Sequence, residues 1–550
     1  MLKAPRFQLI RKKQQQMMRL PFPTGGLNFM ADNMTMSPDD TYLCDNLIPS
    51  AKGLEVRKGW KFWVPDSLDF STEVRTLMTF NAQDPANSKV FAGVNVGNGL
   101  IYDVTTQNSA PVLALTPSTA ADVPGEWYWT NFVTPGLNVI LMVSAGAGYY
   151  IYDFVNGWRE ITAGTGSNKI TFPDSTTTKD LAFIWIWKRR VWFLKKNSNT
   201  AYYLPIDSIT GSAQLFEFGA QMPRGGALSF GTNWTYDSGD GIDDALVIVS
   251  RQGDVLIYEG TDPANAATFA QKGTWYAGRV PYGRRGYSQY GGDIVMMTEY
   301  GMVRLSDLIS GKLHTTEIGG TIATKINPLL ADAISDYIEQ RYWFVIPYPT
   351  EELLIIGSPY LNTISQSLTS FAMNAHTAGW CTFSNMDMLC ATVFNGKLIM
   401  GTRKGEIIQA LTGFRDGDSA DGVIFGDEVT GRCQGAFLDY GLPNNNKRML
   451  RVKVYGSSQD YPSFLIIFKD EYNLQEFLNV SAPAAKIRAL WDVGVWDLTE
   501  WQSGDVSSFR RWIGVAAYGK KLSMQFVVRG SGPTILSDFE TLFEPANIGL

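Results

Sequence analysis

Short apolar runs, each ended by Gly, Asn or Asp, recur along most of this chain of 550 residues. Runs of four to six apolar or aromatic residues with such endings are typical of β-strands buried on both faces. Helix signals are sparse, and the best short candidate is 328–338, where Asn327 is placed to cap the first turn and Pro328 suits the first helical position. The pattern predicts an all-β protein. Clear strand candidates are 138–143, 183–187, 245–249 and 293–297.

A short motif recurs among these strands: Gly, an apolar run that ends on Tyr or Leu, and then an acid. Its apolar markers lie 50, 51, 55 and 47 residues apart. The markers are Tyr102, Tyr152, Tyr203, Tyr258 and Leu305. Units of roughly 40 to 50 residues, each rich in β signals, are what β-propeller blades produce. We therefore expect a propeller of six to seven blades over 66–412.

Both ends of the chain differ from this repeat. Residues 1–20 form a basic arm with six Lys or Arg and no acid, and 21–65 form an extended leader punctuated by Gly and Pro. The acidic, Gly-rich stretch 413–430 predicts a linker. Longer alternating strands in 431–550 favour a C-terminal antiparallel β-sandwich with one wet face per sheet. The arm is either a solvated tail, the preferred interpretation, or a segment that docks on a partner or on DNA.

The composition is that of a large folded protein. Hydrophobic residues make up 45% of the chain, and no apolar stretch reaches the roughly 18 residues that a membrane helix needs. With the six basic residues of the arm set aside, 41 Lys and Arg stand against 53 Asp and Glu. Affinity for nucleic acid comes mainly from Lys and Arg at phosphates. The acidic body is thus a poor general binder of DNA, but it suits a passage along which DNA slides.

Side chains that perform catalysis or bind metals are scarce. The chain has two histidines, and its four cysteines lack CxxC spacing, which fits a protein made in a reducing cytoplasm. The scarcity of His argues against metal chemistry and against His-dependent catalysis. We expect no enzyme, no cofactor, and no catalytic, cofactor-binding or metal-ligating residues. The residues concerned are His314, His376, Cys44, Cys381, Cys390 and Cys433.

Three polar features stay open as candidate sites. Segments 237–244 and 416–422 are rich in Asp and Gly but lack the register of a calcium loop, so acidic turns are preferred over metal binding. Arg284 and Arg285 form a basic turn that could clamp a phosphate or carboxylate. Solvation, or pairing with an acid of a neighbouring subunit, is the simpler interpretation of that turn. A carboxylate pair for glycoside hydrolysis also stays open, because 53 acids always offer pairs.

Groups of residues in the leader, the middle and the C-terminal part resemble, in the same order, the tail nozzle (tail tube B) proteins of short-tailed bacteriophages. The leader supplies Gly25-Gly26-Leu27-Asn28, Asp45-Asn46, Gly53 and Arg57-Lys58-Gly59. The middle supplies 292–298 with Gly301 and Ser306, and the C-terminal part supplies Gly431-Arg432, 437–441, Lys447-Arg448, the strand to Tyr455 and Phe543-Glu544-Pro545. The order of these motifs is more specific than any one of them.

The resemblance implies a structural virion protein of the phage tail, synthesised in the host cytoplasm. It implies a homohexameric ring at the tip of a short tail, beneath the tail adaptor ring, with tail fibres as further neighbours. Such a ring retains the packaged genome and provides the channel for DNA ejection, without sequence-specific binding of the DNA. The alternatives are a propeller-type glycan hydrolase or lyase, and a receptor-binding tail component.

Overall fold

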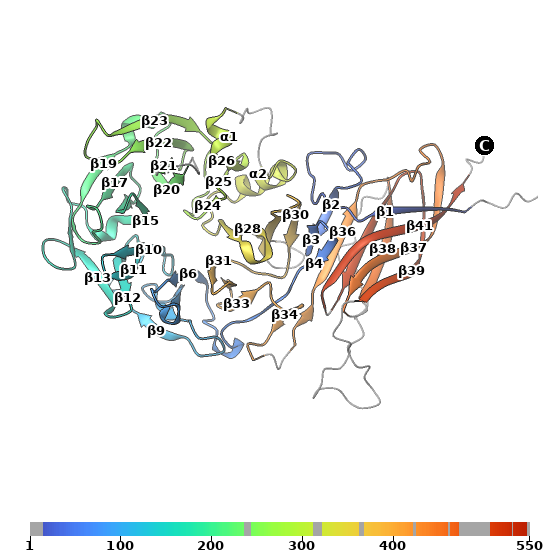
Figure 1. Ribbon diagram of the computed structural model, residues 1–550, viewed down its shortest axis with the longest axis horizontal. Helices are drawn as coiled ribbons and strands as arrows, with labels where there is room; N and C mark the ends of the chain where they lie inside the picture. Colours follow the sequence, from blue (N-terminus) through green and yellow to red (C-terminus); the bar gives the residue numbers. More distant parts are fainter. Residues whose placement is uncertain are drawn as a thin grey trace, which may run out of the picture. The chain divides into compact units, whose positions relative to one another are not determined.

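The computed structural model describes residues 15–235, 244–311, 322–361, 368–421, 425–459, 462–471, 507–530 and 532–546. Over these residues the chain is almost entirely β, as expected, and it divides into two compact units (Figure 1). One unit takes its described residues from Met1–Arg57, Gly379–Cys381 and Glu428–Leu550, and we call it the sandwich. The other comprises Lys58–Ala378 and Thr382–Asp427, and we call it the propeller.

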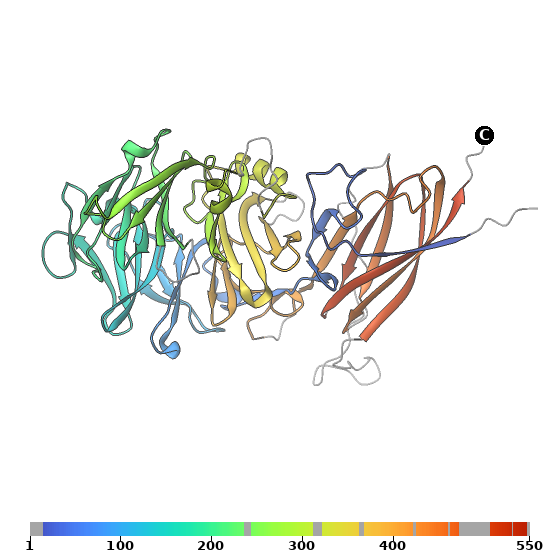
Figure 2. The same cartoon turned by 45° about the horizontal axis from the view of Figure 1, so that its top comes forward.

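Over the described residues the propeller is a ring of seven blades, each built on antiparallel strands, which confirms the predicted fold (Figures 1 and 2). The first blade consists of β6 (Val74–Phe80), β7 (Lys89–Val94), β8 (Ile101–Asp103) and β9 (Val112–Leu115). The second blade contains β10 (Tyr128–Thr134), β11 (Leu137–Ser144), β12 (Gly148–Asp153) and β13 (Gly157–Ala163). The third blade consists of β15 (Leu181–Trp187), β16 (Arg190–Lys195), β17 (Thr200–Tyr203) and β19 (Gln214–Glu217). The fourth blade consists of β20 (Leu228–Thr235), β21 (Asp244–Ser250), β22 (Asp254–Gly260) and β23 (Phe269–Tyr276). The fifth is β24 (Tyr287–Tyr290), β25 (Asp293–Thr298), β26 (Gly301–Arg304), and the sixth is β27 (Phe344–Tyr348), β28 (Leu353–Leu361), β29 (Leu368–Asn374). The seventh contains β31 (Cys390–Phe394), β32 (Lys397–Gly401) and β33 (Ile407–Ala410).

The repeated motif has the same place in each of the first five blades, at or just after the third strand. Its glycines turn the chain into that strand with a φ between 93° and 115°, a backbone conformation that favours glycine. They are Gly99, Gly148, Gly253 and Gly301. The third blade lacks this glycine, which explains why its copy of the motif is looser.

Every acid of the motif pairs with a basic side chain of its own blade. Lys89 lies 2.9 Å from Asp103, Lys272 lies 2.5 Å from Glu259, and Arg304 lies 2.9 Å from Asp307. The remaining pairs are Asp153 with Arg159 and Asp207 with Arg189. The motif therefore holds the turns and edges of the blades.

A strand from the leader completes the seventh blade. The strand β5 (Trp60–Phe62) pairs antiparallel to β33, and β34 (Arg415–Asp418) adds parallel to β5. The seventh blade also bonds the first, through a 2.7 Å contact between the hydroxyls of Thr79 and Thr392. Part of the leader 21–65 and part of the linker 413–430 thus belong to the propeller, because the open edge of β33 pairs with β5 and β5 in turn pairs with β34.

The sandwich combines strands from both ends of the chain, and the predicted C-terminal β-sandwich is confirmed. One sheet contains β1 (Gln16–Pro21), β3 (Leu47–Ser50), β4 (Gly53–Val56), β37 (Asn446–Ser458), β39 (Ser507–Gly519) and β41 (Thr534–Ala546). The second contains β2 (Thr41–Asp45), β36 (Thr430–Gly435), β38 (Ser463–Asp470) and β40 (Leu522–Arg529). Phe22 packs between them, with ring centroids 5.2 Å from Phe526 and 5.3 Å from Phe539.

The leader and the arm differ from the sequence-based prediction at this point. Four leader or arm strands pair within the sandwich, so these segments are not simply laid over a finished domain. Residues 16–21 of the expected arm and its junction form β1 along β41, where Arg19 lies 2.8 Å from Asp538. Residues 1–14 of the arm lie outside the described residues.

Candidate functional site: the axial cavity of the propeller

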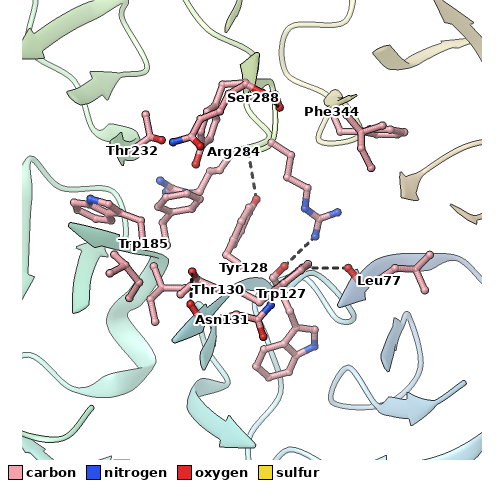
Figure 3. A pocket seen from close by; sticks show the side chains of 18 of the residues that line it. Leu77, Trp127, Tyr128, Thr130, Asn131, Trp185, Thr232, Arg284, Ser288 and Phe344 are labelled. Atoms are coloured by element: carbon pink, nitrogen blue, oxygen red, sulfur yellow. Dashed lines mark hydrogen bonds between the residues drawn. The ribbon is translucent and has the colours of Figure 1, made fainter. Parts of the chain in front are cut away.

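A cavity of about 860 Å³ occupies the axis of the propeller (Figure 3). The first strand of every blade contributes to its lining: β6, β10, β15, β20, β24, β27 and β31. These strands run from a closed floor, near Tyr128, towards a mouth where Asn81, Val133 and Gln289 are exposed. The ring geometry thus forms a cup that is open at one end.

Arg285 closes much of the floor by bonding three groups on other blades. Its Nη1 donates to the carbonyl of Arg75 at 2.7 Å, and its Nη2 donates to Thr76 Oγ1 at 2.6 Å and to the carbonyl of Trp127 at 3.0 Å. Its backbone carbonyl accepts from Val345 at 3.2 Å. One residue from the loop before the fifth blade therefore ties together the first, second and sixth blades.

Arg284 covers the rest of the floor. Its Nη1 donates to the carbonyls of Leu228, at 2.9 Å, and Ser229, both at the start of the fourth blade. Its backbone N–H lies 3.4 Å from the hydroxyl of Tyr128, on the second blade. The solvated interpretation of the Arg284–Arg285 turn is therefore wrong: a glycine-flanked loop directs both side chains inward, where backbone carbonyls need donors.

Neither guanidinium of the floor forms an ion pair with a carboxylate of the described residues. Glu126 lies behind the floor, where it accepts from Tyr128 and lies 3.3 Å from Arg341. Burial lowers the pKa of the Arg284 guanidinium from its ordinary value, and burial together with the charge of Glu126 raises the pKa of the Tyr128 phenol. The cup consequently ends on two half-buried cations and a neutral phenol.

The walls of the cup are aromatic and amide-rich. Amides connect the first strands of neighbouring blades: Asn131 Nδ2 donates to the carbonyl of Thr79 at 2.9 Å, and Gln289 Nε2 donates to that of Asn233 at 3.1 Å. Three buried polar atoms of the lining have no hydrogen-bond partner among the described residues: Trp127 Nε1, Trp185 Nε1 and Asn233 Oδ1. The aromatic side chains of the lining include Trp129, Phe132, Phe183, Trp185, Tyr287 and Phe344.

None of the sequence motifs considered above contains these wall residues as a candidate site. A signal was present, because Thr130-Asn131 and Thr232-Asn233 repeat a Thr-Asn pair on the first strands of the second and fourth blades. The residues that line the cup include no Asp or Glu. A carboxylate pair of the kind that glycoside hydrolysis uses is therefore not found in this lining.

The other candidate residues lie apart from the cup. His376 is exposed and lies 2.7 Å from Glu352, and all four cysteines are buried free thiols. In segment 416–422, Asp416 and Asp418 belong to β34. Residues 237–243, His314 and residue 422 lie outside the described residues. Over the described ranges no cluster of three or more metal-binding side chains occurs, and no helix there is long and apolar enough to cross a membrane.

The leader residues that carry the phage resemblance meet residues of the C-terminal part inside the sandwich. Fully buried Arg57 donates from Nε to Asn46 Oδ1 at 2.7 Å, and Asn46 Nδ2 donates to the carbonyl of Thr430 at 3.0 Å. Asp45 and Arg432 are register partners of paired strands. A Cβ at Gly431 would lie 2.6 Å from the end of the Leu47 side chain, so a larger residue there would require Leu47 to move. We call Asp45, Asn46, Arg57, Gly431 and Arg432 the leader junction.

Comparison with known proteins identifies no family. No protein-family model and no curated protein matches the chain. Among solved structures, the computationally designed Ika8 protein is similar at 7% identity with a TM-score of 0.32, over 64% of this chain and 99% of its own. YCF48 bound to a D1 peptide is similar at 10% identity with a TM-score of 0.34, over 65% of this chain and 98% of its own.

Proposed function

We propose that this protein is the tail nozzle of a short-tailed bacteriophage: a structural virion protein without catalysis. Copies of the chain would form a homohexameric ring at the tip of the tail, beneath the adaptor ring. The ring would retain the packaged genome and provide the channel through which DNA leaves. It would be made in the host cytoplasm and then be part of the virion.

The observation that carries the proposal is the leader junction. Motifs that resemble the nozzle family lie almost 400 residues apart in the sequence, between Asp45 and Gly431. They nevertheless pair in one buried network, with Arg57, Asn46 and the carbonyl of Thr430 joined by hydrogen bonds. The mutual dependence of these residues supports the proposal that the motif order reflects a shared way of joining the leader to the C-terminal domain.

The closed floor of the cup excludes the axis of a single propeller as the path of the DNA. Arg284 and Arg285 bond across the axis to four other blades, so the axis of a single propeller is not a passage. The conduit would instead lie between copies, framed by the outer surfaces of several chains. Those surfaces belong to a body with more acidic than basic residues, which disfavours retention of a phosphate backbone.

The experiment is to make phage particles with and without this chain. We expect particles that lack it to package DNA and then lose it, so that nuclease-protected DNA falls, and purified chain added back should restore protection. As a matched control, chain carrying Arg57→Met, which breaks the leader junction, should restore less than chain carrying the exposed change Arg189→Met. Full DNA retention without the chain would refute the nozzle proposal, and so would a glycan-degrading activity of the purified chain.

A further inference from the structure

The floor of the axial cavity holds more positive charge than its surroundings neutralise. Arg284 and Arg285 bond only carbonyl and hydroxyl groups among the described residues, and the nearby Glu126 is engaged by Tyr128 and Arg341. Both guanidinium groups are half-buried, and a charge withdrawn from water is normally paired because its desolvation without a partner is unfavourable. Two cations thus lie at the bottom of an open cup, and no carboxylate of the described residues is in ion-pair contact with either of them.

Part of the donor capacity of these arginines is unused. All side-chain hydrogen bonds of Arg284 leave from Nη1, so its Nε and Nη2 donate to no described residue. Arg285 likewise uses Nη1 and Nη2 but not Nε. A guanidinium carries five N–H donors in a planar fork, which matches the oxygens of a carboxylate or a phosphate. The free donors can therefore receive an oxyanion without breaking the bonds that hold the blades.

The walls above this floor favour a ligand that is rich in hydroxyls and has apolar C–H faces. Amides and hydroxyls line the mouth and walls, among them Asn81, Thr232 and Asn233, and Asn233 Oδ1 is a buried acceptor without a donor. Aromatic rings alternate with these groups, but some ring faces are already covered. Tyr287 stacks on Phe230 at 4.0 Å and 6°, and Trp185 stacks on Trp192 at 5.5 Å. Flat stacking of a nucleobase between two rings is therefore less suited to this cup than edge and face contacts with a sugar ring.

We propose that the axial cavity is a binding site for an acidic saccharide. The carboxylate or phosphate of the sugar would lie on the free donors of Arg284 and Arg285, and its ring and hydroxyls would contact the aromatic and amide walls. A volume of about 860 Å³ is within the range of small-molecule sites and exceeds the needs of one sugar unit. The site needs no second copy of the chain, so the binding test of this proposal does not depend on whether the nozzle proposal holds.

The test is a calorimetric titration of the purified full-length chain with glucuronic acid, glucose 6-phosphate, glucose, acetate and AMP. An acidic sugar gains a hydrogen-bonded charge pair with the arginines of the floor, and glucose does not. We therefore expect at least one of the two acidic sugars to bind tenfold or more tightly than glucose. Acetate should bind more weakly than that sugar because it lacks the wall contacts. Equal affinity for glucose, tighter binding of AMP, or no binding of either acidic sugar would overturn the proposal. The two acidic sugars distinguish a carboxylate ligand from a phosphate ligand.

Variants place the site. Arg284→Met should abolish the preference for the acidic sugar, whereas Arg189→Met, at an exposed arginine outside the cup, should leave affinity unchanged. Asn233→Ala removes the unpartnered wall oxygen without removing a side-chain hydrogen bond within the protein, so it should weaken binding while the circular dichroism spectrum is retained. If Arg284→Met does not fold, the Asn233→Ala result decides: unchanged affinity in that folded variant would contradict the assignment of the site.

Discussion

Arg285 Nη2 donates to the carbonyl of Trp127 at 3.0 Å, so a side chain from the loop before the fifth blade bonds the backbone of the second blade. This contact crosses the axis of the ring rather than the seam between neighbouring blades. In a propeller each blade otherwise packs mainly on its two neighbours. Arg285 therefore adds hydrogen bonds across the axis of a structure whose blades otherwise contact mainly their neighbours. We call these bonds the central tie, and they also close the floor of the cavity.

Removing that tie should destabilise the propeller. Arg285→Met deletes three hydrogen bonds from a charged donor and leaves buried acceptors on the first and second blades, which predicts a loss of about 2–4 kcal/mol in the free energy of unfolding. Urea unfolding followed by tryptophan fluorescence measures this loss. Arg189→Met is the control, since Arg189 is exposed and should change stability by about 0.5 kcal/mol or less. Equal effects of the two changes would show that the floor contacts contribute little.

The acids of the blade motif should differ in importance according to burial. The Asp153 side chain is fully buried and accepts from the backbone of Val155 and Asn156 as well as from Arg159. Asp153→Asn removes the charge that these donors stabilise, which predicts a loss of about 2–3 kcal/mol. Glu259→Gln, at an exposed acid in the same motif position of the fourth blade, should cost about 0.5 kcal/mol or less. Thermal unfolding of both variants provides the comparison, and a larger effect at Glu259 would contradict it.

Glycine at position 26 should be required by a close approach of backbone to backbone. Its φ is 72°, and a Cβ there would lie 2.5 Å from the backbone nitrogen of Trp380. Gly26→Ala therefore adds a steric clash to the strain of a left-handed conformation, and should destabilise the sandwich by more than about 2 kcal/mol. Gly441→Ala is a matched control within the sandwich, with a φ of 75° and no atom within 4 Å of the added Cβ. Denaturant unfolding should show the difference, and equal losses would rule out the clash.

Buried thiols predict a decline of stability at alkaline pH. Burial raises the pKa of the Cys390 and Cys433 thiols to about 12 each, above about 8.5 in an unfolded chain. A raised folded pKa favours the protonated form, so this stabilisation is complete below pH of about 8.5 and is lost as pH rises towards 12. The free energy of unfolding should fall by up to about 1.4 kcal/mol per pH unit for each such thiol.

The measurement is denaturant unfolding at about pH 7, 8.5 and 10, which stays at or below the ordinary pKa of tyrosine. The double variant Cys390→Ala, Cys433→Ala should be less stable at pH 7 but should decline less between pH 8.5 and 10. Parallel declines of the two proteins would show that other groups cause the alkaline effect.

The periodic part of the fold could be predicted from the sequence because the same local sequence pattern recurs in successive blades. A glycine turn, a buried third strand and a paired acid recur at nearly constant spacing. The spacing of the Tyr and Leu markers in these repeats predicted the propeller. The Tyr and Leu markers lie at or just after the third strand of the first five blades. The predicted helix is also present, as α2 (Asn327–Asp336), although Asn327 lies inside it rather than capping it.

Contacts between distant segments could not be predicted in the same way. Nothing local in Trp60–Phe62 shows that it pairs with β33, more than 340 residues later, because the pairing depends on an open edge elsewhere. The same holds for Arg284 and Arg285, whose two-residue basic turn is typical of an exposed loop. Their inward orientation follows from the convergence of seven inner strands on one axis, where backbone carbonyls need donors.

The most direct test of the nozzle proposal is a reconstruction of the tail tip of short-tailed phage particles assembled with this chain. We expect six copies in a ring around a channel, each propeller closed on its own axis at Arg284 and Arg285, with the DNA path between the copies. A monomeric copy at the side of the tail, or density for DNA along the axis of a single propeller, would contradict it.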